Sequence, residues 1–81
     1  MGRFYMIHRP ERLVDIMFEM RMAKLEPKRI RYVHSDVEKA PVMVMVEGRK
    51  CAKPYIKTEP PLVIYNKDGS YTNEVLKIYN D

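Results

Sequence analysis

Residues 42–46 read Val-Met-Val-Met-Val, and this stretch decides which strand lies at the centre of the sheet. Valine is β-branched and favours strands, and successive side chains of a strand point to opposite faces. The valines therefore share one face and the methionines share the other, so both faces are apolar. A strand of this kind belongs in the middle of a sheet that is covered on both sides. We predict a central strand over residues 42–46.

A strand, a helix and a second strand are expected on the N-terminal side of this stretch. Residues 3–8 (RFYMIH) are rich in β-formers and predict a mostly buried strand, which begins with no lead-in. Pro10 suits the first position of a helix, which we expect to run to about Leu25 before residues 26–28 (EPK) end it. Arg29 and Arg31 alternate with Ile30 and Tyr32, and this alternation predicts a second strand over residues 30–33.

The expected helix carries two neighbouring rows of apolar side chains at helical spacing. The first row consists of Leu13, Ile16, Met17, Met20 and Ala23 or Lys24. The second row consists of Val14, Phe18, Met22 and Leu25. A helix on one face of a small sheet does not need the second row. That row therefore predicts either loose cover by the C-terminal tail or contact with a partner.

The order of these elements predicts the topology of the sheet. A strand–helix–strand unit should be parallel with a right-handed crossover. The strand at residues 42–46 follows a short loop and should run antiparallel to the strand before it. If this doubly apolar strand is central, the sheet order is first, third, second. The expected fold class is α/β (an α+β fragment): a three-stranded mixed sheet with one long helix.

The C-terminal part of the chain predicts only short elements. Residues 49–61 are rich in lysine and proline and predict an irregular connection. Residues 62–65 and 70–72 predict a hairpin around the turn at residues 66–69, where Asp-Gly tolerates positive φ. Residues 73–79 predict a short helix. We therefore divide the chain into a sheet unit at residues 1–50 and a tail, with the basic connection, hairpin and helix, at residues 51–81.

Composition limits the class of protein. The chain has 81 residues, 46% of them hydrophobic, which suits one small globular domain of marginal stability. Its one cysteine, Cys51, excludes an internal disulfide and fits a reducing cytoplasm. No apolar run approaches the length of a membrane span, so we expect a cytoplasmic protein. The net charge of +4 weakly favours an anionic partner such as nucleic acid.

Three stretches together resemble a known enzyme family. They read RFYMIHRPERLVDIMFEMRMAKLEPKRIRYVH, then VMVMVEGRK, then PPLVIYNKDGSYTNEVLKIY. In this order they resemble the C-terminal part of bacterial tRNA adenine-N6 methyltransferases, which are class I S-adenosylmethionine-dependent enzymes. The resemblance covers nearly the whole chain. It implies that the three expected strands are the last three of a Rossmann-like methyltransferase sheet, with the strands before them missing.

The departures from that family matter for activity. Such enzymes hold S-adenosylmethionine on a glycine-rich loop and receive adenine with an Asn-Pro-Pro-aromatic motif. The chain has only three glycines, far apart, and its one Pro-Pro pair lies in the segment 59–62 (EPPL), where glutamate and leucine replace the asparagine and the aromatic residue. We therefore expect a fragment of a methyltransferase that binds no cofactor and is not catalytic alone. S-adenosylmethionine would belong to the intact enzyme, and the missing N-terminal part would be the partner.

Basic and aromatic residues in two places predict contact with tRNA. Ligands of open α/β sheets collect at the carboxyl ends of parallel strands, where Arg9 and Arg12 follow the first strand. The densest basic stretch interleaves cations with an aromatic ring, as suits single-stranded RNA, and it contains Arg49, Lys50, Lys53 and Tyr55. Ordinary surface charge is the competing interpretation for both groups.

Two further expectations concern metals and partners. A site built from His8, His34 and Cys51 is conceivable, but an antiparallel third strand puts the cysteine at the opposite end of the sheet, so we expect no metal. The alternative to a methyltransferase fragment is a free-standing α+β interaction or RNA-binding module. In either case the edge of the first strand and the second apolar row would be uncovered, which predicts a homodimer or a tail folded over the gap.

Overall fold

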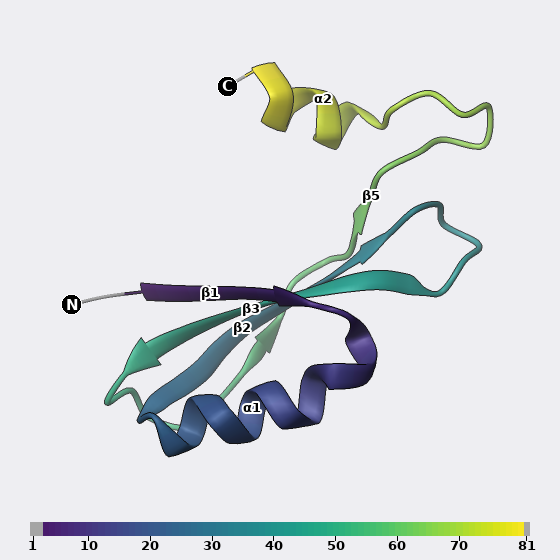
Figure 1. Cartoon of the computed structure of the whole chain (residues 1–81). Coiled ribbons are helices and arrows are strands. Elements are labelled where there is room, and N and C mark those ends of the chain that lie inside the picture. The colour runs from purple at the N-terminus through teal and green to yellow at the C-terminus, as the bar shows by residue number, and fades with distance from the viewer. Residues whose placement is uncertain (1–2, 81) are drawn as a thin grey trace.

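The structure is a computed structural model that describes residues 3–80, with side chains through residue 78. One helix lies against one face of a mixed sheet, and a short second helix lies on the opposite side of that sheet (Figure 1). In chain order the elements are β1 (Arg3–His8), the 3-10 turn η1 (Pro10–Arg12), α1 (Leu13–Met22), β2 (Leu25–His34), β3 (Pro41–Lys50), β4 (Lys57–Thr58), β5 (Leu62–Val63) and α2 (Asn73–Asn80).

The strand order at the centre of the sheet is confirmed. The sheet runs β1-β3-β2-β4, with β5 also pairing with β2. Both β1 and β2 are antiparallel to β3, so they are parallel to each other. Val44 lies opposite His8 on one side and Tyr32 on the other, so the carboxyl ends of β1 and β2 lie at the same end of the sheet. The expected small α/β sheet, with one helix and a short C-terminal helix, is therefore correct.

The helix is shorter than its composition predicts. Pro10 opens η1, α1 follows from Leu13, and the helix ends at Met22 instead of continuing to about Leu25. Lys24 adopts the left-handed conformation with φ of 63°, which turns the chain away from the helix axis. Leu25 then begins β2, which is ten residues long and includes Pro27 beside an irregularity in its pairing. The EPK segment thus belongs to the strand and not to a connection.

The core lies between α1 and the valine face of β3. Ile16 and Met20 of the helix pack with Val44, Val46 and Ile30, and all five are buried. Leu13 and Met17 of the predicted first row are half-buried against this cluster, as expected. Gly48 makes room for the core at the end of β3, because a Cβ there would collide with the Met20 methyl group.

Burial of the two apolar strands differs from the prediction. The first strand was expected to be mostly buried, but Phe4, Tyr5 and Ile7 are all exposed, because β1 is an edge strand and α1 covers only one face. The methionine face of β3 was expected to be covered, yet Met43 is exposed and Met45 only half-buried. We call this uncovered side, opposite α1, the open face of the sheet.

The tail takes part in the sheet. Residues 49–61 are not simply irregular: residues 49 and 50 belong to β3, and β4 pairs in parallel with β2 at Arg29 and Ile30. The strand β5 pairs in parallel with the end of β2. The boundary drawn at residue 50 stays a prediction, but hydrogen bonds between strands cross it. Lys24 and the left-handed Cys51 are also joined, because the Cys51 amide donates to the Lys24 carbonyl oxygen over 3.2 Å.

The expected turn and C-terminal helix are present. Gly69, with φ of 90°, lies in the turn, and Tyr65 and Tyr71 form a single antiparallel bridge with stacked rings instead of a longer hairpin ladder. The helix α2 follows, and Thr72 acts as its cap, because its hydroxyl oxygen accepts from the Val75 amide at 3.5 Å. None of the helices between residues 3 and 80 combines the length and apolar character needed to cross a membrane.

Candidate functional site

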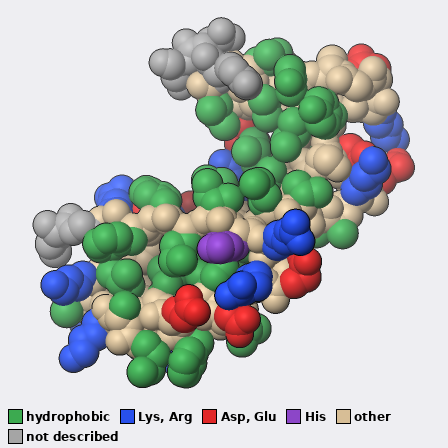
Figure 2. All heavy atoms as spheres, in the orientation of Figure 1, with side chains coloured by type: hydrophobic (Ala, Val, Ile, Leu, Met, Phe, Trp, Pro, Cys, Tyr) green, Lys and Arg blue, Asp and Glu red, His purple; other side chains and the backbone are tan. Residues whose placement is uncertain are grey.

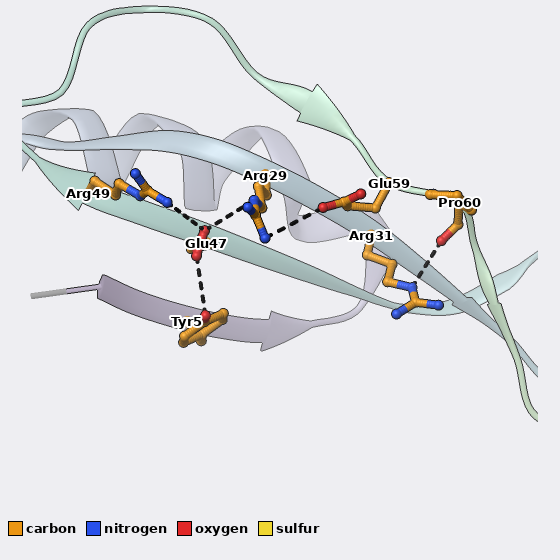
Figure 3. Close-up of polar contacts among 7 residues, drawn as sticks. All are labelled: Tyr5, Arg29, Arg31, Glu47, Arg49, Glu59 and Pro60. Atoms are coloured by element: carbon orange, nitrogen blue, oxygen red, sulfur yellow. Dashed lines mark hydrogen bonds and ion pairs between the residues drawn. The ribbon is translucent and has the colours of Figure 1, made fainter. Parts of the chain in front are cut away.

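A polar network occupies the open face around Glu47 of β3 (Figure 3). Period-two alternation puts Glu47 on the same face as Met43 and Met45, and the register places Tyr5 and Arg29 opposite it on the two neighbouring strands. The Tyr5 hydroxyl donates a hydrogen bond of 3.2 Å to Oε1 of Glu47. The second oxygen, Oε2, lies 3.7 Å from Nε of Arg29 and 4.0 Å from Nη2 of Arg49.

Two arginines of β2 connect this network to the tail. Arg29 also lies 3.6 Å, through Nη1, from Oε1 of Glu59. Arg31 donates from Nε to the Pro60 carbonyl oxygen over 2.9 Å and forms a short ion pair with Glu74 of α2. These contacts fasten residues 59–60 and the start of α2 across the open face, close to the central strand.

Glu47 is the one buried charged residue of the described part of the chain, with 3% of its surface exposed. A buried carboxylate must be paired and hydrogen-bonded to offset its lost hydration. Tyr5 supplies a hydrogen bond to Oε1, and Arg29 and Arg49 supply opposite charges. However, among the described residues neither Oε2 of Glu47 nor Nε of Arg49 has a hydrogen-bond partner.

The network borders a cavity of about 430 Å³ on the open face. Its lining includes Tyr5, Arg29, Arg31, Met45, Glu47 and Glu59. This volume lies within the range of small-molecule sites, and the mixture of an apolar floor with a few converging polar groups is typical of them. The cavity therefore has the size of a small-molecule site, and both cationic and acidic side chains line it.

The sequence contains one signal for these residues. The alternation of Arg29 and Arg31 with Ile30 and Tyr32 marks a polar face on β2. Continuing the alternation of residues 42–46 by one step would place Glu47 on the methionine face of the same sheet. Its burial has no local signal, since it depends on Tyr5 and Arg29 from two other strands.

The structure divides the predicted nucleic-acid residues between the two ends of the sheet. Arg9 follows β1 and Arg12 ends η1, so both lie at the carboxyl ends of the parallel strands, as predicted. Arg12 pairs with Asp15 at 3.5 Å, and both side chains are more than half exposed. Arg49 and Lys50 lie at the opposite end, beside Arg3 and Leu25. The two groups therefore do not form one continuous basic surface.

The residues after β3 form an exposed basic loop. Lys53 is exposed, and its carbonyl oxygen accepts a hydrogen bond of 2.8 Å from Nζ of Lys28. Tyr55 is 87% exposed and has φ of 132°, a conformation that is strained for a residue with a Cβ. Strained backbone is found preferentially at functional positions. The Tyr55 ring is therefore accessible at the surface, and its stacking on RNA stays a prediction.

A second hollow runs along the outer side of α1. The second apolar row of the helix is not covered by the tail: Val14 is 79% exposed, and Phe18 and Met22 are exposed as well. Together with Tyr55 and Ile56 they line a groove of about 600 Å³. Hydrophobic side chains gather at the lower rim of the molecule, where α1 runs, and along β1 (Figure 2).

One bidentate ion pair closes the end of this groove. Arg21 donates to Glu26 from Nη2 over 2.7 Å and from Nε over 3.1 Å. These hydrogen bonds lower the pKa of Glu26 below its ordinary value and raise that of Arg21. Both residues line the groove, where the Arg21 side chain is exposed and the Glu26 side chain is mostly buried, with 14% of its surface exposed.

The described glycines do not fit a site for S-adenosylmethionine. Gly48 lies within β3, and the space beside its Cα on the α1 side of the sheet is filled by Met20. Gly69 lies in an exposed turn, and a Cβ there would have no atom within 4 Å. Neither forms a cradle between a strand and a helix, where the backbone could approach a cofactor. Between residues 3 and 80, no group of three or more metal-ligating side chains comes together, and His8 and His34 lie at the opposite end of the sheet from Cys51.

Comparison with known proteins identifies the fold. No protein-family model matches the chain, and no curated protein is significantly similar to it. Among solved structures it is similar to a predicted O-methyltransferase, protein Atu636 from Agrobacterium tumefaciens, with a TM-score of 0.86 and 19% sequence identity. The match covers 98% of this chain and 38% of that chain. The chain therefore has the fold of part of a methyltransferase and spans little more than a third of the structure that it matches.

Proposed function

We propose that the chain is the C-terminal part of an S-adenosylmethionine-dependent tRNA (adenine-N6) methyltransferase and is not active alone. The observation that carries the proposal is the likeness to a methyltransferase structure over 98% of this chain but 38% of that chain. The motifs of the sequence resemble the C-terminal part of the tRNA enzymes. The absence of a glycine cradle in residues 3–80 agrees with a cofactor site in another part of the enzyme.

In this role the chain completes the methyltransferase sheet. Within the described residues β1 pairs only with β3, so its other edge has free backbone donors and acceptors. Such an edge pairs readily with a further strand. The exposed Phe4, Tyr5 and Ile7 of β1 would be covered when the remainder of the enzyme continues the sheet there.

The same proposal assigns RNA contacts to the two basic groups. Arg9 and Arg12, at the carboxyl ends of the parallel strands, would hold phosphates of the tRNA. At the opposite end Lys50 and Lys53 would bind the backbone of a single-stranded segment while Tyr55 stacks on a base. Arg49 is engaged with Glu47, so its contribution to RNA should be smaller.

The size of the native protein tests whether the chain is a fragment. An immunoblot of the source cells with an antibody against this chain should detect a band well above 9.7 kDa. The larger protein, purified with that antibody, should bind S-adenosylmethionine in a calorimetric titration, whereas the chain alone should not. A native band at 9.7 kDa would contradict the proposal.

Filter binding of tRNA tests the two basic groups separately. The double variants Arg9→Gln/Arg12→Gln and Lys50→Gln/Lys53→Gln should each weaken binding and reduce the dependence of log K on log salt by about two phosphate contacts. The double variant Lys67→Gln/Lys77→Gln is the matched control, because it removes the same number of charges and both lysines are exposed in another part of the chain. Equal loss in all three variants would mean that only the net charge attracts the RNA.

A free-standing interaction module is the second candidate. It is favoured by the exposed apolar groove along α1, which the tail leaves uncovered. It differs from the fragment in one measurable way: a small native protein would exist in the cell and would bind its partner without any S-adenosylmethionine-binding part. The immunoblot therefore separates the two candidates.

A further inference from the structure

The groove along α1 is an apolar surface that the described part of the chain leaves uncovered. Val14, Phe18 and Met22 follow one another at intervals of four residues, so they form one row of about 12 Å along the helix. Their side chains are 65–79% exposed. Tyr55 and Ile56 lie across the groove from this row. An exposed apolar surface of this kind is typical of a site that contacts another molecule.

The net positive charge of the chain is concentrated beside this groove. Residues 21–28 and 53–57, which border it, contain five of the fifteen cationic residues but only one of the eleven acidic residues. The other ten cationic and ten acidic residues cancel, so the net charge of +4 belongs to these two segments. The one acidic residue, Glu26, is already paired with Arg21. An occupant with an apolar face and acidic flanks is therefore complementary to the groove.

The polar groups of the lining favour a helical occupant. Arg21 and Glu26 are hydrogen-bonded to each other, which leaves the Tyr55 hydroxyl as the one other polar side-chain group in the described lining. An extended peptide would lose the hydration of its backbone N–H and C=O groups here without gaining partners for them. A helix satisfies these groups within itself and presents only side chains to the groove.

The same lining disfavours the two competing occupants. Tyr55 and Lys53 belong to the basic loop to which the proposed function assigns RNA, so RNA is the first competitor. A base can stack on Tyr55, but inside the groove its polar edge would face apolar side chains without hydrogen-bond partners. A second copy of this chain is the other competitor, and it brings the same excess of positive charge to the contact.

We propose that this groove binds an acidic amphipathic helix of another protein. The apolar face of that helix packs along the row of Val14, Phe18 and Met22, and its carboxylates pair with the lysines of the two bordering segments. Helices with apolar anchors at positions i, i+3, i+4 and i+7 bind in grooves of this kind. The proposal does not depend on methyltransferase activity, since every group that it uses lies in this chain.

The probe is a synthetic peptide of about 18 residues, a length at which an isolated helix can form in water. It has leucines at helical spacing and glutamates beside them, and its matched control replaces every glutamate with lysine. In a titration followed by two-dimensional ¹⁵N–¹H NMR of the 81-residue chain, the acidic peptide should shift the amide signals of Phe18, Met22 and Ile56 in a saturable way. The lysine peptide should bind at least about tenfold more weakly, because it meets like charge at the groove.

One pair of variants tests the apolar contact. Phe18→Gln should weaken binding of the acidic peptide at least about tenfold, because it removes an anchor from the middle of the row. Ile78→Gln is the matched control, since it also removes an exposed apolar side chain but lies on α2, and it should change binding by less than about twofold.

A second pair tests the charge. Lys53→Gln/Lys57→Gln should weaken binding at least about threefold and make it less sensitive to salt. Lys67→Gln/Lys77→Gln removes the same number of exposed charges in another part of the chain and should have a smaller effect on both quantities. The amide dispersion of each variant first shows that it is folded. If a variant unfolds, the comparison of the two peptides on the unmodified chain still decides.

Four results would overturn the proposal. The first is the absence of saturable shifts with the acidic peptide. The second is equal binding of the two peptides, which would mean that the charge beside the groove has no role. The third is a single-stranded RNA that shifts Phe18 and Met22 at lower concentration than the acidic peptide does, which would assign the groove to RNA. The fourth is a dimer in sedimentation that Phe18→Gln converts to a monomer, which would assign the groove to a second copy.

Discussion

The Tyr5 hydroxyl donates a hydrogen bond to the buried carboxylate of Glu47 across the β1–β3 pair. Tyr5 itself is exposed, so an accessible side chain on the edge strand holds a charge at the centre of the sheet. In this way a surface residue contributes to the interior. The stability of the edge strand is therefore linked to that of the polar network.

Removing this hydroxyl tests the link. Tyr5→Phe should lower the free energy of unfolding by about 1–2 kcal/mol, since it removes a hydrogen bond to an ionised group that has little access to water. Urea denaturation measures the change. Tyr55→Phe is the control, because Tyr55 is exposed and its hydroxyl makes no hydrogen bond to the described residues; it should change stability by less than about 0.5 kcal/mol. Equal effects would contradict the link.

The core prediction uses two residues of the same helix. Ile16 is 2% exposed and Val14 lies on the outer row. Ile16→Val should cost about 1 kcal/mol, because it leaves a methyl-sized cavity against Val44 and Val46. Val14→Ala removes more atoms but should cost less than about 0.5 kcal/mol. Thermal denaturation followed by circular dichroism compares them, and a larger loss for Val14→Ala would mean that the outer row is covered in solution.

The bidentate pair at the rim of the groove predicts a pH dependence. Arg21 lowers the pKa of Glu26 in the folded chain. A depressed carboxyl pKa contributes stability that is present above the unfolded pKa and is lost as pH falls through the folded pKa. Arg21→Gln should raise the pKa of Glu26 toward its ordinary value and make the stability less sensitive to acid between these two values. A ¹³C NMR titration of the Glu26 carboxyl measures this, and an unchanged pKa would show that the pair does not persist in solution.

We propose that the isolated chain forms a homodimer through the free edge of β1. In sedimentation it should then associate, and Ile7→Lys should give a monomer, because a charge on an exposed edge strand opposes strand pairing. Ile78→Lys adds the same charge on α2, where the side chain is equally accessible, and should leave the association unchanged. A monomeric unmodified chain would exclude the dimer.

The central part of the fold could be predicted because its signals are local. The alternating valines and methionines indicated the middle strand, and the strand–helix–strand order indicated the parallel pair on either side of it. The strand β4 could not be predicted, since it has two residues and exists only through pairing with β2. The strand β5 lies inside the strand expected at residues 62–65, but it pairs with β2 and not with residues 70–72. The exposure of β1 was also missed, because the apolar composition of a strand does not reveal whether a neighbour covers it.

The candidate site was harder to predict than the fold. Glu47 follows an apolar strand and precedes Gly48 and Arg49, so the segment looks like the end of a strand. In the structure β3 continues to Lys50, and the partners of the carboxylate come from residues far away in the sequence. Tyr5 and Arg29 reach Glu47 because of the register in which the three strands pair, and the pattern of residues along one strand does not reveal that register.

The hydrogen bond from the Cys51 amide to the Lys24 carbonyl oxygen joins two left-handed corners. One corner connects α1 to β2 and the other is the exit of β3 toward the tail. Because each corner holds the other in its strained conformation, the two should open as one cooperative unit. The exchange rate of the Cys51 amide with solvent deuterium would then report the opening of both corners. The substitution Lys24→Gly should slow that exchange, since it relieves the strain at the partner corner.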